Sequence, residues 1–102
     1  MLLVIIMKLV SVLLKGFDIR QVGANKTNIY TFSAMETDLN GARIPVELQT
    51  FNEEAKNKIS QYLNSQEELL IPFTEIKDFR GVNQYSINNI VTHPDFIILS
   101  QI

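Results

Sequence analysis

The order of apolar and polar residues along the chain predicts a mostly β protein. From Lys8 to Val22 the residues are rich in β-branched types and alternate between two faces, which is typical of a strand. Gly16 interrupts this run, and a glycine inside a strand predicts a bulge or a sharp bend. Turn-like segments separate it from the later strands. These strands are expected at Ile29–Thr37, Arg43–Phe51, Leu69–Phe79 and Gln84–Thr92.

One segment between the third and fourth strands has a helical period instead. Asn52 is a good N-cap, and the two glutamates after it suit the positive end of a helix dipole. The pattern predicts a helix of about twelve residues that ends near Ser65 and needs packing to be stable. Its apolar stripe consists of Ala55, Ile59, Tyr62 and Leu63.

Three strands, a helix and two strands, in that order, predict a five-stranded Greek-key barrel of the OB type, with the helix closing its open end. The alternative is an open α+β sheet with the helix on one face. The 102 residues suffice for a single domain. Within it, residues 1–6 are a candidate N-terminal extension, and residues 95–102 are a candidate extra strand or tail. The apolar run at the N-terminus is too short for a membrane span and is interrupted by Lys8.

The hairpin at Asn40-Gly41 leaves two registers open between the second and third strands. A two-residue turn would put Tyr30 and Phe32 on the polar face, where they could stack on a ligand. A three-residue loop ending in Gly41 would put Phe32 opposite Leu48 in the core. The second register gives the cleaner apolar pattern, and we therefore favour it.

Charge and composition narrow the function. The net charge is −2, yet residues 1–46 carry +2 and residues 47–102 carry −4. An acidic chain argues against a strong, non-specific grip on duplex DNA but leaves room for a local basic groove. The chain has no cysteine, which excludes disulfides, thiolate metal sites and cysteine nucleophiles and suits a cytoplasmic protein.

No pattern in the chain predicts an enzyme. His93 is the one histidine, and no nucleophile or carboxylate motif surrounds it. The glutamate pairs Glu53-Glu54 and Glu67-Glu68 flank the helix, so solvation of its ends explains them better than acid–base chemistry. Phosphate-loop, dinucleotide and zinc motifs are absent from the sequence. We therefore expect no catalysis, no cofactor and no metal.

A binding module is the better interpretation. OB barrels bind oligomers on their second and third strands and with the loops that join strands one to two and four to five. Single-stranded nucleic acid is held there by cations that pair with phosphates and aromatic rings that stack on bases. Phe17 is either a stacking platform or a core residue, and the first-hairpin cations bind phosphate or only solvate the hairpin. Phe79-Arg80-Gly81 joins an aromatic ring to a cation at a hairpin tip, which is useful but unspecific. The candidate site residues are Lys15, Phe17, Arg20, Lys26, Tyr30, Phe32, Arg43 and Arg80.

The layout of these residues resembles the small single-stranded DNA-binding proteins of phages and plasmids. The resemblance is carried by the run from Lys15 to Arg20, the loop Asn25–Asn28 leading into Tyr30-Thr31-Phe32, and the hairpin after Gly41. It implies a homodimer or higher homo-oligomer that coats single-stranded DNA, or RNA, during replication or recombination. The alternative hypothesis is a structural subunit that self-associates through its terminal strands and binds no nucleic acid.

Overall fold

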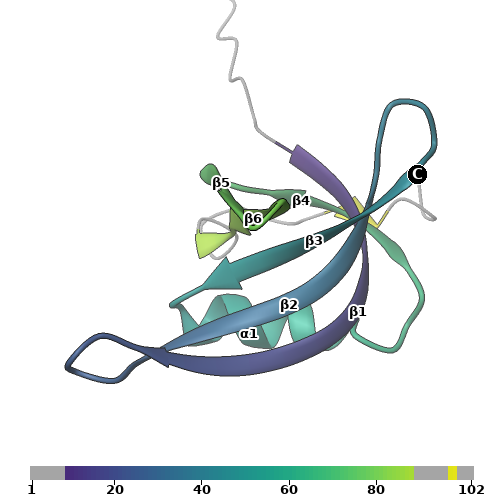
Figure 1. Cartoon of the computed structure of the whole chain (residues 1–102). Coiled ribbons are helices and arrows are strands. Elements are labelled where there is room, and N and C mark those ends of the chain that lie inside the picture. Colours follow the sequence, from purple (N-terminus) through teal and green to yellow (C-terminus); the bar gives the residue numbers. More distant parts are fainter. Residues whose placement is uncertain (1–8, 89–96, 99–102) are drawn as a thin grey trace, which may run out of the picture.

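The computed structural model describes residues 9–88 and 97–98 and shows a mostly β protein with one short helix (Figure 1). The predicted fold class is confirmed. The helix, α1 (Glu53–Ser60), lies between the third and fourth strands, as expected. The strands are β1 (Leu9–Val22), β2 (Thr27–Thr37), β3 (Arg43–Thr50), β4 (Glu68–Pro72), β5 (Glu75–Phe79), β6 (Val82–Ser86) and β7 (Ile97–Ile98).

The strands form one curled sheet in the order β5-β6-β3-β2-β1-β4-β7. β3 and β6 run parallel, and every other neighbouring pair is antiparallel. β4 pairs with β1 near one end of this order, whereas β5 pairs with β6 at the other end. Because only Phe73 and Thr74 separate β4 from β5, this bent segment curls the sheet back on itself in an OB-like barrel. β7 adds the extra C-terminal strand, beside β4.

Several predicted boundaries were wrong, among them the end of the fifth strand, which lies at Ser86 rather than Thr92. The fourth strand breaks at Phe73 and Thr74 into β4 and β5. The fifth begins at Val82 rather than Gln84, because a two-residue turn already reverses the chain after Phe79. The helix ends at Ser60, and backbone bonds between residues three apart tighten the chain after it.

The core lies between α1 and the face of the sheet that α1 covers, which we call the inner face. Phe32, Leu48 and Ile59 are among its fully buried side chains, and the helical residues Tyr62 and Leu63 of the prediction pack against it from beyond the end of α1. Asn52 caps the helix as predicted: its side-chain oxygen accepts hydrogen bonds from the backbone N–H groups of the second and third residues after it, at 2.8 and 3.3 Å.

The β2–β3 hairpin adopts the favoured register. Phe32 pairs with Leu48, and a three-residue loop ending in Gly41 joins the strands between Asp38 and Ala42. Gly41 has a φ of 82°, which a residue with a side chain rarely adopts. The Asp38 carboxylate accepts bonds from the N–H groups of Asn40 and Ala42 at 2.9 and 2.8 Å, so the sequence stabilises the loop locally.

Some predictions fall outside the described residues, namely those on residues 1–6, on His93 and on most of the tail after Asp95. In the part of the chain that the structure describes, no helix is long and apolar enough to cross a membrane. Within the same residues, no cluster of three or more histidine, aspartate or glutamate side chains could hold a metal ion.

Candidate nucleic-acid interface

A β-bulge in β1 decides which side chains of this strand reach the surface. The register with β2 shifts between Leu14 and Gly16, so that Lys15 is the extra residue. Val12 and Leu14 face the core, but after the bulge Phe17 pairs with Phe32 and takes the inner face. The bulge therefore places Arg20 on the outer face. Without the bulge, Arg20 would lie on the same face as Val12 and Leu14 and would point inward.

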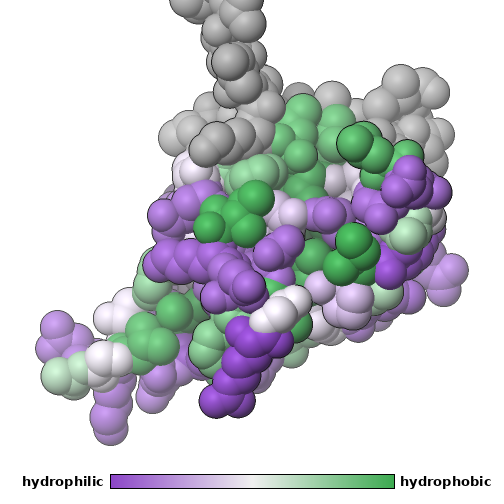
Figure 2. Space-filling model, turned by 45° about the horizontal axis from the view of Figure 1, so that its top comes forward, coloured by the Kyte–Doolittle hydropathy of each residue, from purple (hydrophilic) through white to green (hydrophobic). Residues whose placement is uncertain are grey.

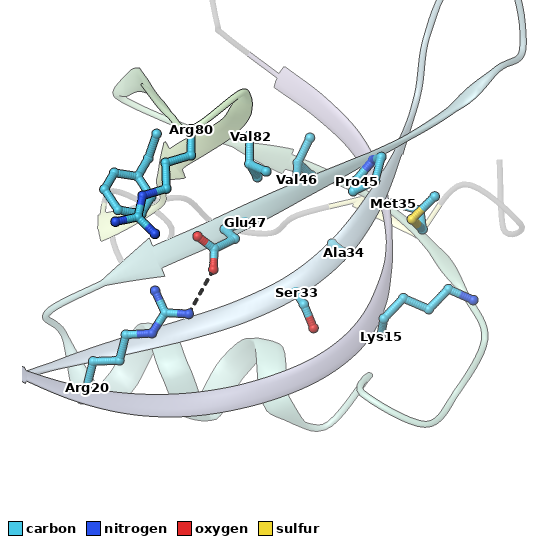
Figure 3. A pocket seen from close by; sticks show the side chains of 11 residues that line it. Lys15, Arg20, Ser33, Ala34, Met35, Pro45, Val46, Glu47, Arg80 and Val82 are labelled. Carbon is cyan, nitrogen blue, oxygen red and sulfur yellow. Dashed lines mark hydrogen bonds and ion pairs between the residues drawn. The ribbon is translucent and has the colours of Figure 1, made fainter.

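The outer face carries a groove of about 410 Å³, which we call the outer groove. Figure 3 shows Lys15 and Arg20 on its β1 side and Arg80 on the opposite side, with β2 and β3 as its floor. Most of its lining is apolar, with a few polar groups, a composition typical of ligand sites. Its residues are Lys15, Arg20, Ser33, Ala34, Met35, Pro45, Val46, Glu47, Phe79, Arg80 and Val82.

The β5–β6 turn supplies a cation and an aromatic ring to the outer groove. Arg80 and Gly81 form its two-residue loop with φ values of 53° and 82°, as in the turns that suit the twist of a hairpin. The Asp78 carboxylate accepts a hydrogen bond from the Gly81 N–H at 2.9 Å and holds the turn. The Arg80 guanidinium lies 5.1 Å from the centre of the Phe79 ring, which is 51% exposed. This turn presents a platform on which a base could stack.

A carboxylate lies within the same groove. Glu47 Oε2 accepts from Arg20 at 3.1 Å, and Glu47 Oε1 accepts from the Gln84 side-chain amide at 2.8 Å. Arg20 also contacts Asp18 at 3.4 Å. The Glu47 side chain is only 17% exposed, so this ion pair is fixed from two sides and partly shielded from water. Within residues 9–88 and 97–98, neither Lys15 nor Arg80 forms an ion pair, which leaves both ammonium and guanidinium charges for a ligand.

The outer groove continues into a second hollow along β1 and β2. This hollow shares Arg20, Ser33 and Glu47 with it and is also lined by Thr31. The Thr31 hydroxyl is buried and has no hydrogen-bond partner among the described residues, which is uncommon for a buried polar group. In the view of Figure 2 the exposed hydrophobic side chains form separate patches between hydrophilic ones, as is usual for protein surfaces.

Three predicted cations meet in the outer groove, but the predicted aromatic residues do not. Phe32 is fully buried, so its proposed stacking on bases was wrong: the three-residue hairpin loop turns its ring into the core. Phe17 and Tyr30 share this inner face beyond the barrel core. Their rings are stacked with centroids 6.4 Å apart, and Lys56 of α1 lies 5.3 Å from the Tyr30 ring. Tyr30 is thus on the opposite side of the sheet from the outer groove, and Phe17, whose ring contacts that of Phe32, reaches only the edge of the second hollow.

The two other predicted cations also lie away from the outer groove. Arg43 pairs with Glu68 of β4 at 2.6 Å, and its charge is therefore partly neutralised. Lys26 is in the β1–β2 turn, at the tip of the hairpin that projects from the body in Figure 1. A ligand that filled the outer groove would touch neither residue.

Three residues of the site are absent from the set predicted from the sequence. Phe79 was recognised only as part of an unspecific hairpin tip, and Glu47 and Gln84 were not considered. The signal for Phe79 was its place before a cation and a glycine, which is the composition of a tight turn. No local signal links Glu47 to Arg20, because 27 positions separate them and only the pairing of three strands brings them together.

Comparisons of this chain with protein-family models, with curated proteins and with solved structures find no match.

Proposed function

We propose that this protein binds single-stranded nucleic acid in the outer groove. The observation that carries the proposal is the convergence of Lys15, Arg20 and Arg80 with Phe79 on one concave surface. These residues come from β1 and from the β5–β6 turn, so only the curled sheet brings them together. Cations beside an exposed ring are the two features that a single strand requires, since its phosphates need charge and its bases need a stacking surface.

Each of these residues has a proposed role in binding the nucleic acid. Lys15 and Arg80 lie on opposite sides of it and are suited to pair with successive phosphates. Phe79 offers its exposed ring to a base, while Arg80 covers part of this ring from 5.1 Å. Arg20 contributes less charge because Glu47 already pairs with it. The apolar floor suits the faces of unstacked bases, which a duplex does not present.

The overall charge favours single strands over duplexes. Tight non-specific binding to a duplex needs a dense basic face, but the chain has a net charge of −2. A groove with a few cations and one ring fits a ligand whose bases contribute to affinity. We therefore propose DNA-strand coating in phage- or plasmid-type replication or recombination, in the cytoplasm, by a homodimer or higher homo-oligomer.

The test is a titration of a labelled, mixed-sequence oligonucleotide of about 15 nucleotides, followed by fluorescence anisotropy at low salt. The wild-type protein should bind it, and an excess of duplex should compete poorly. The double variant Lys15→Gln/Arg80→Gln should bind at least about tenfold more weakly, which corresponds to roughly 1.4 kcal/mol.

The matched control is the double variant Lys56→Gln/Lys58→Gln, which removes the same charge from α1 on the other side of the sheet. Its affinity for the oligonucleotide should stay within a factor of about two of the wild-type affinity, because the change in net charge has only a small, salt-screened effect. Absence of binding by the wild-type protein at low salt would refute the proposed function. Equal losses in both double variants would show that binding depends on net charge rather than on the groove.

One observation favours the second candidate, a self-associating structural subunit. The projecting β1–β2 hairpin exposes Ile19 and Val22, which are 50% and 41% accessible. Apolar side chains on a protruding arm are typical of contacts between subunits. A stable oligomer whose mass does not change with oligonucleotide, and which binds none, would favour this candidate over the first.

A further inference from the structure

The second half of β1 has an edge along which no described strand lies. β4 pairs with β1 only from Leu9 to Leu13, and from Gly16 to Val22 the strand pairs only with β2, on its other edge. This part of β1 forms the lower border of the projecting hairpin in Figure 1. Among the residues that the structure describes, its outward N–H and C=O groups therefore have no strand to pair with. Such an edge is a template for pairing with another chain.

The side chains along this edge leave it accessible to a second chain. Every residue from Phe17 to Val22 is exposed, and Ile19 lies at the middle of the segment with half of its surface accessible. Asp18 and Arg20 flank it on the outer face and contact each other at 3.4 Å. Edges that exclude other chains often carry charges that repel a second copy. This edge carries one charge of each sign, so it can attract its own copy.

Two copies of this edge match each other in one register. When identical strands pair antiparallel about a two-fold axis perpendicular to the sheet, opposed residues point to the same face, so the axis passes between one residue and its own copy. An axis at Ile19 places Asp18 of each copy opposite Arg20 of the other. An axis at Asp18 or at Arg20 would place two like charges opposite each other, which is destabilising. A larger displacement would run the pairing into the bulge at Lys15 or past the end of β1.

We infer that two copies of this chain pair antiparallel through the β1 edge from Gly16 to Val22, about a two-fold axis at Ile19. Backbone hydrogen bonds then cross the interface, and the two Ile19 side chains pack on each other on the inner face. The two Asp18–Arg20 ion pairs lie on the outer face. Because the axis is perpendicular to the sheet, both outer grooves open on the same side of one continuous sheet. The inference goes beyond the proposed function and does not depend on the binding of nucleic acid.

The first experiment uses the absence of cysteine from the sequence. Ile19→Cys places one thiol at the axis, where it faces its own copy at a Cβ separation of about 5 Å, close to that of a disulfide. Val22→Cys is the matched control, at an exposed position of the same strand whose two copies would lie about 20 Å apart. In oxidised glutathione, Ile19→Cys should form a disulfide-linked dimer at least about tenfold faster than Val22→Cys, as measured on non-reducing gels.

The second experiment measures the dissociation constant of the dimer by analytical ultracentrifugation, without nucleic acid. Asp18→Arg replaces two attractions across the axis by two repulsions and should weaken dimerisation at least about tenfold. Glu75→Arg is the control, because it makes the same charge change at an exposed position of β5, and it should keep the dissociation constant within a factor of about two.

A wild-type protein that stays monomeric would overturn the inference. Equal rates of cross-linking in the two cysteine variants, or undiminished dimerisation in Asp18→Arg, would overturn it as well. Because neither experiment contains an oligonucleotide, none of these outcomes decides whether the outer groove binds nucleic acid. The failure of this interface and the failure of the proposed nucleic-acid site are therefore distinguishable.

Discussion

The phenol of Tyr85 on β6 donates a hydrogen bond to the carboxylate of Glu36 on β2, and this bond passes over the inner face of β3. β3 lies between these two strands in the sheet, so the bond joins strands that do not pair directly. The Tyr85 ring also packs edge-on against Phe73 in the bend between β4 and β5, with centroids 4.7 Å apart. Tyr85 therefore links the closing segment of the barrel to its central strands.

We expect Tyr85→Phe to destabilise the protein without changing its fold. The variant keeps the ring contact with Phe73 but leaves the half-buried Glu36 carboxylate without this donor. A hydrogen bond to a charged group contributes about 1.5–3 kcal/mol, so the free energy of unfolding in urea should fall by roughly this amount. A double-mutant cycle with Glu36→Gln isolates the bond. Additive losses in the double variant would show that the two side chains are not coupled.

Tyr85 should also make stability depend on pH in alkaline solution. Burial, together with the hydrogen bond to Glu36 and the negative charge of Glu36, raises the pKa of Tyr85 above the ordinary tyrosine value of 10.0. The unfolded chain then loses this proton first, so the stability that the protonated phenol provides is complete below pH 10 and is lost as the pH rises further. Above that pH the free energy of unfolding should fall by up to about 1.4 kcal/mol per pH unit more steeply in the wild type than in Tyr85→Phe. Parallel profiles of the two proteins would contradict this prediction.

Gly16 should resist replacement by alanine because of one neighbouring atom. A Cβ atom at this position would lie 2.7 Å from Ser33 Oγ, closer than such atoms pack. Gly16→Ala should therefore cost about 1 kcal/mol of stability while Ser33 leaves its preferred rotamer. The double variant Gly16→Ala/Ser33→Ala removes the clash and should recover most of the loss in a thermal or urea unfolding measurement. A double variant as unstable as the single one would indicate that the bulge backbone, not Ser33, requires glycine.

Local chemistry made the fold largely predictable from the sequence. The turn residues around Gly41, the N-cap Asn52 and the alternation of β2 and β3 each determine structure within a few positions of themselves. They were sufficient to predict the order of strands and helix along the chain and to favour the register that buries Phe32. Gly16 also signalled the bulge. The sequence did not show that Lys15 would be the extra residue of the bulge. The register shift at this residue is what turns Arg20 outward.

The candidate site was only half predictable because it depends on long-range closure. Arg80 and Phe79 reach the outer groove only because β6 pairs in parallel with β3 and β5 pairs with β6. These pairings bring the β5–β6 turn to the side of the groove opposite β1. The aromatic residues near the first hairpin looked equally suitable in the sequence. A shift of one residue in the register of β1 or β2 exchanges the two faces, and no local signal distinguishes a ring on one face from a ring on the other.

Phe79 and Phe32 should respond to alanine substitution in opposite ways. Phe32 is fully buried, so Phe32→Ala should lower the free energy of unfolding by about 3–5 kcal/mol. Phe79 is half exposed, and Phe79→Ala should change stability much less but weaken oligonucleotide binding by about 1–3 kcal/mol through the loss of stacking. Phe51→Ala is the control, since this ring is 55% exposed and lies outside the outer groove. Unchanged binding in Phe79→Ala would remove the stacking platform from the proposed site.

The salt dependence of binding should report how many phosphates the outer groove neutralises. In the proposed complex, Lys15 and Arg80 would each neutralise a phosphate, and Arg20 would do so only in part because Glu47 already pairs with it. With about two to three neutralised phosphates on a single strand, the logarithm of affinity should fall with the logarithm of salt concentration at a slope of about −1.4 to −2. Arg80→Gln should make this slope shallower by about 0.7, because one counterion fewer is released, whereas Lys58→Gln on α1 should leave it unchanged. Glu47→Gln should act in the other direction and steepen it, since Arg20 would then be available to a phosphate. An identical slope in the wild type and Arg80→Gln would mean that the phosphates lie elsewhere on the surface.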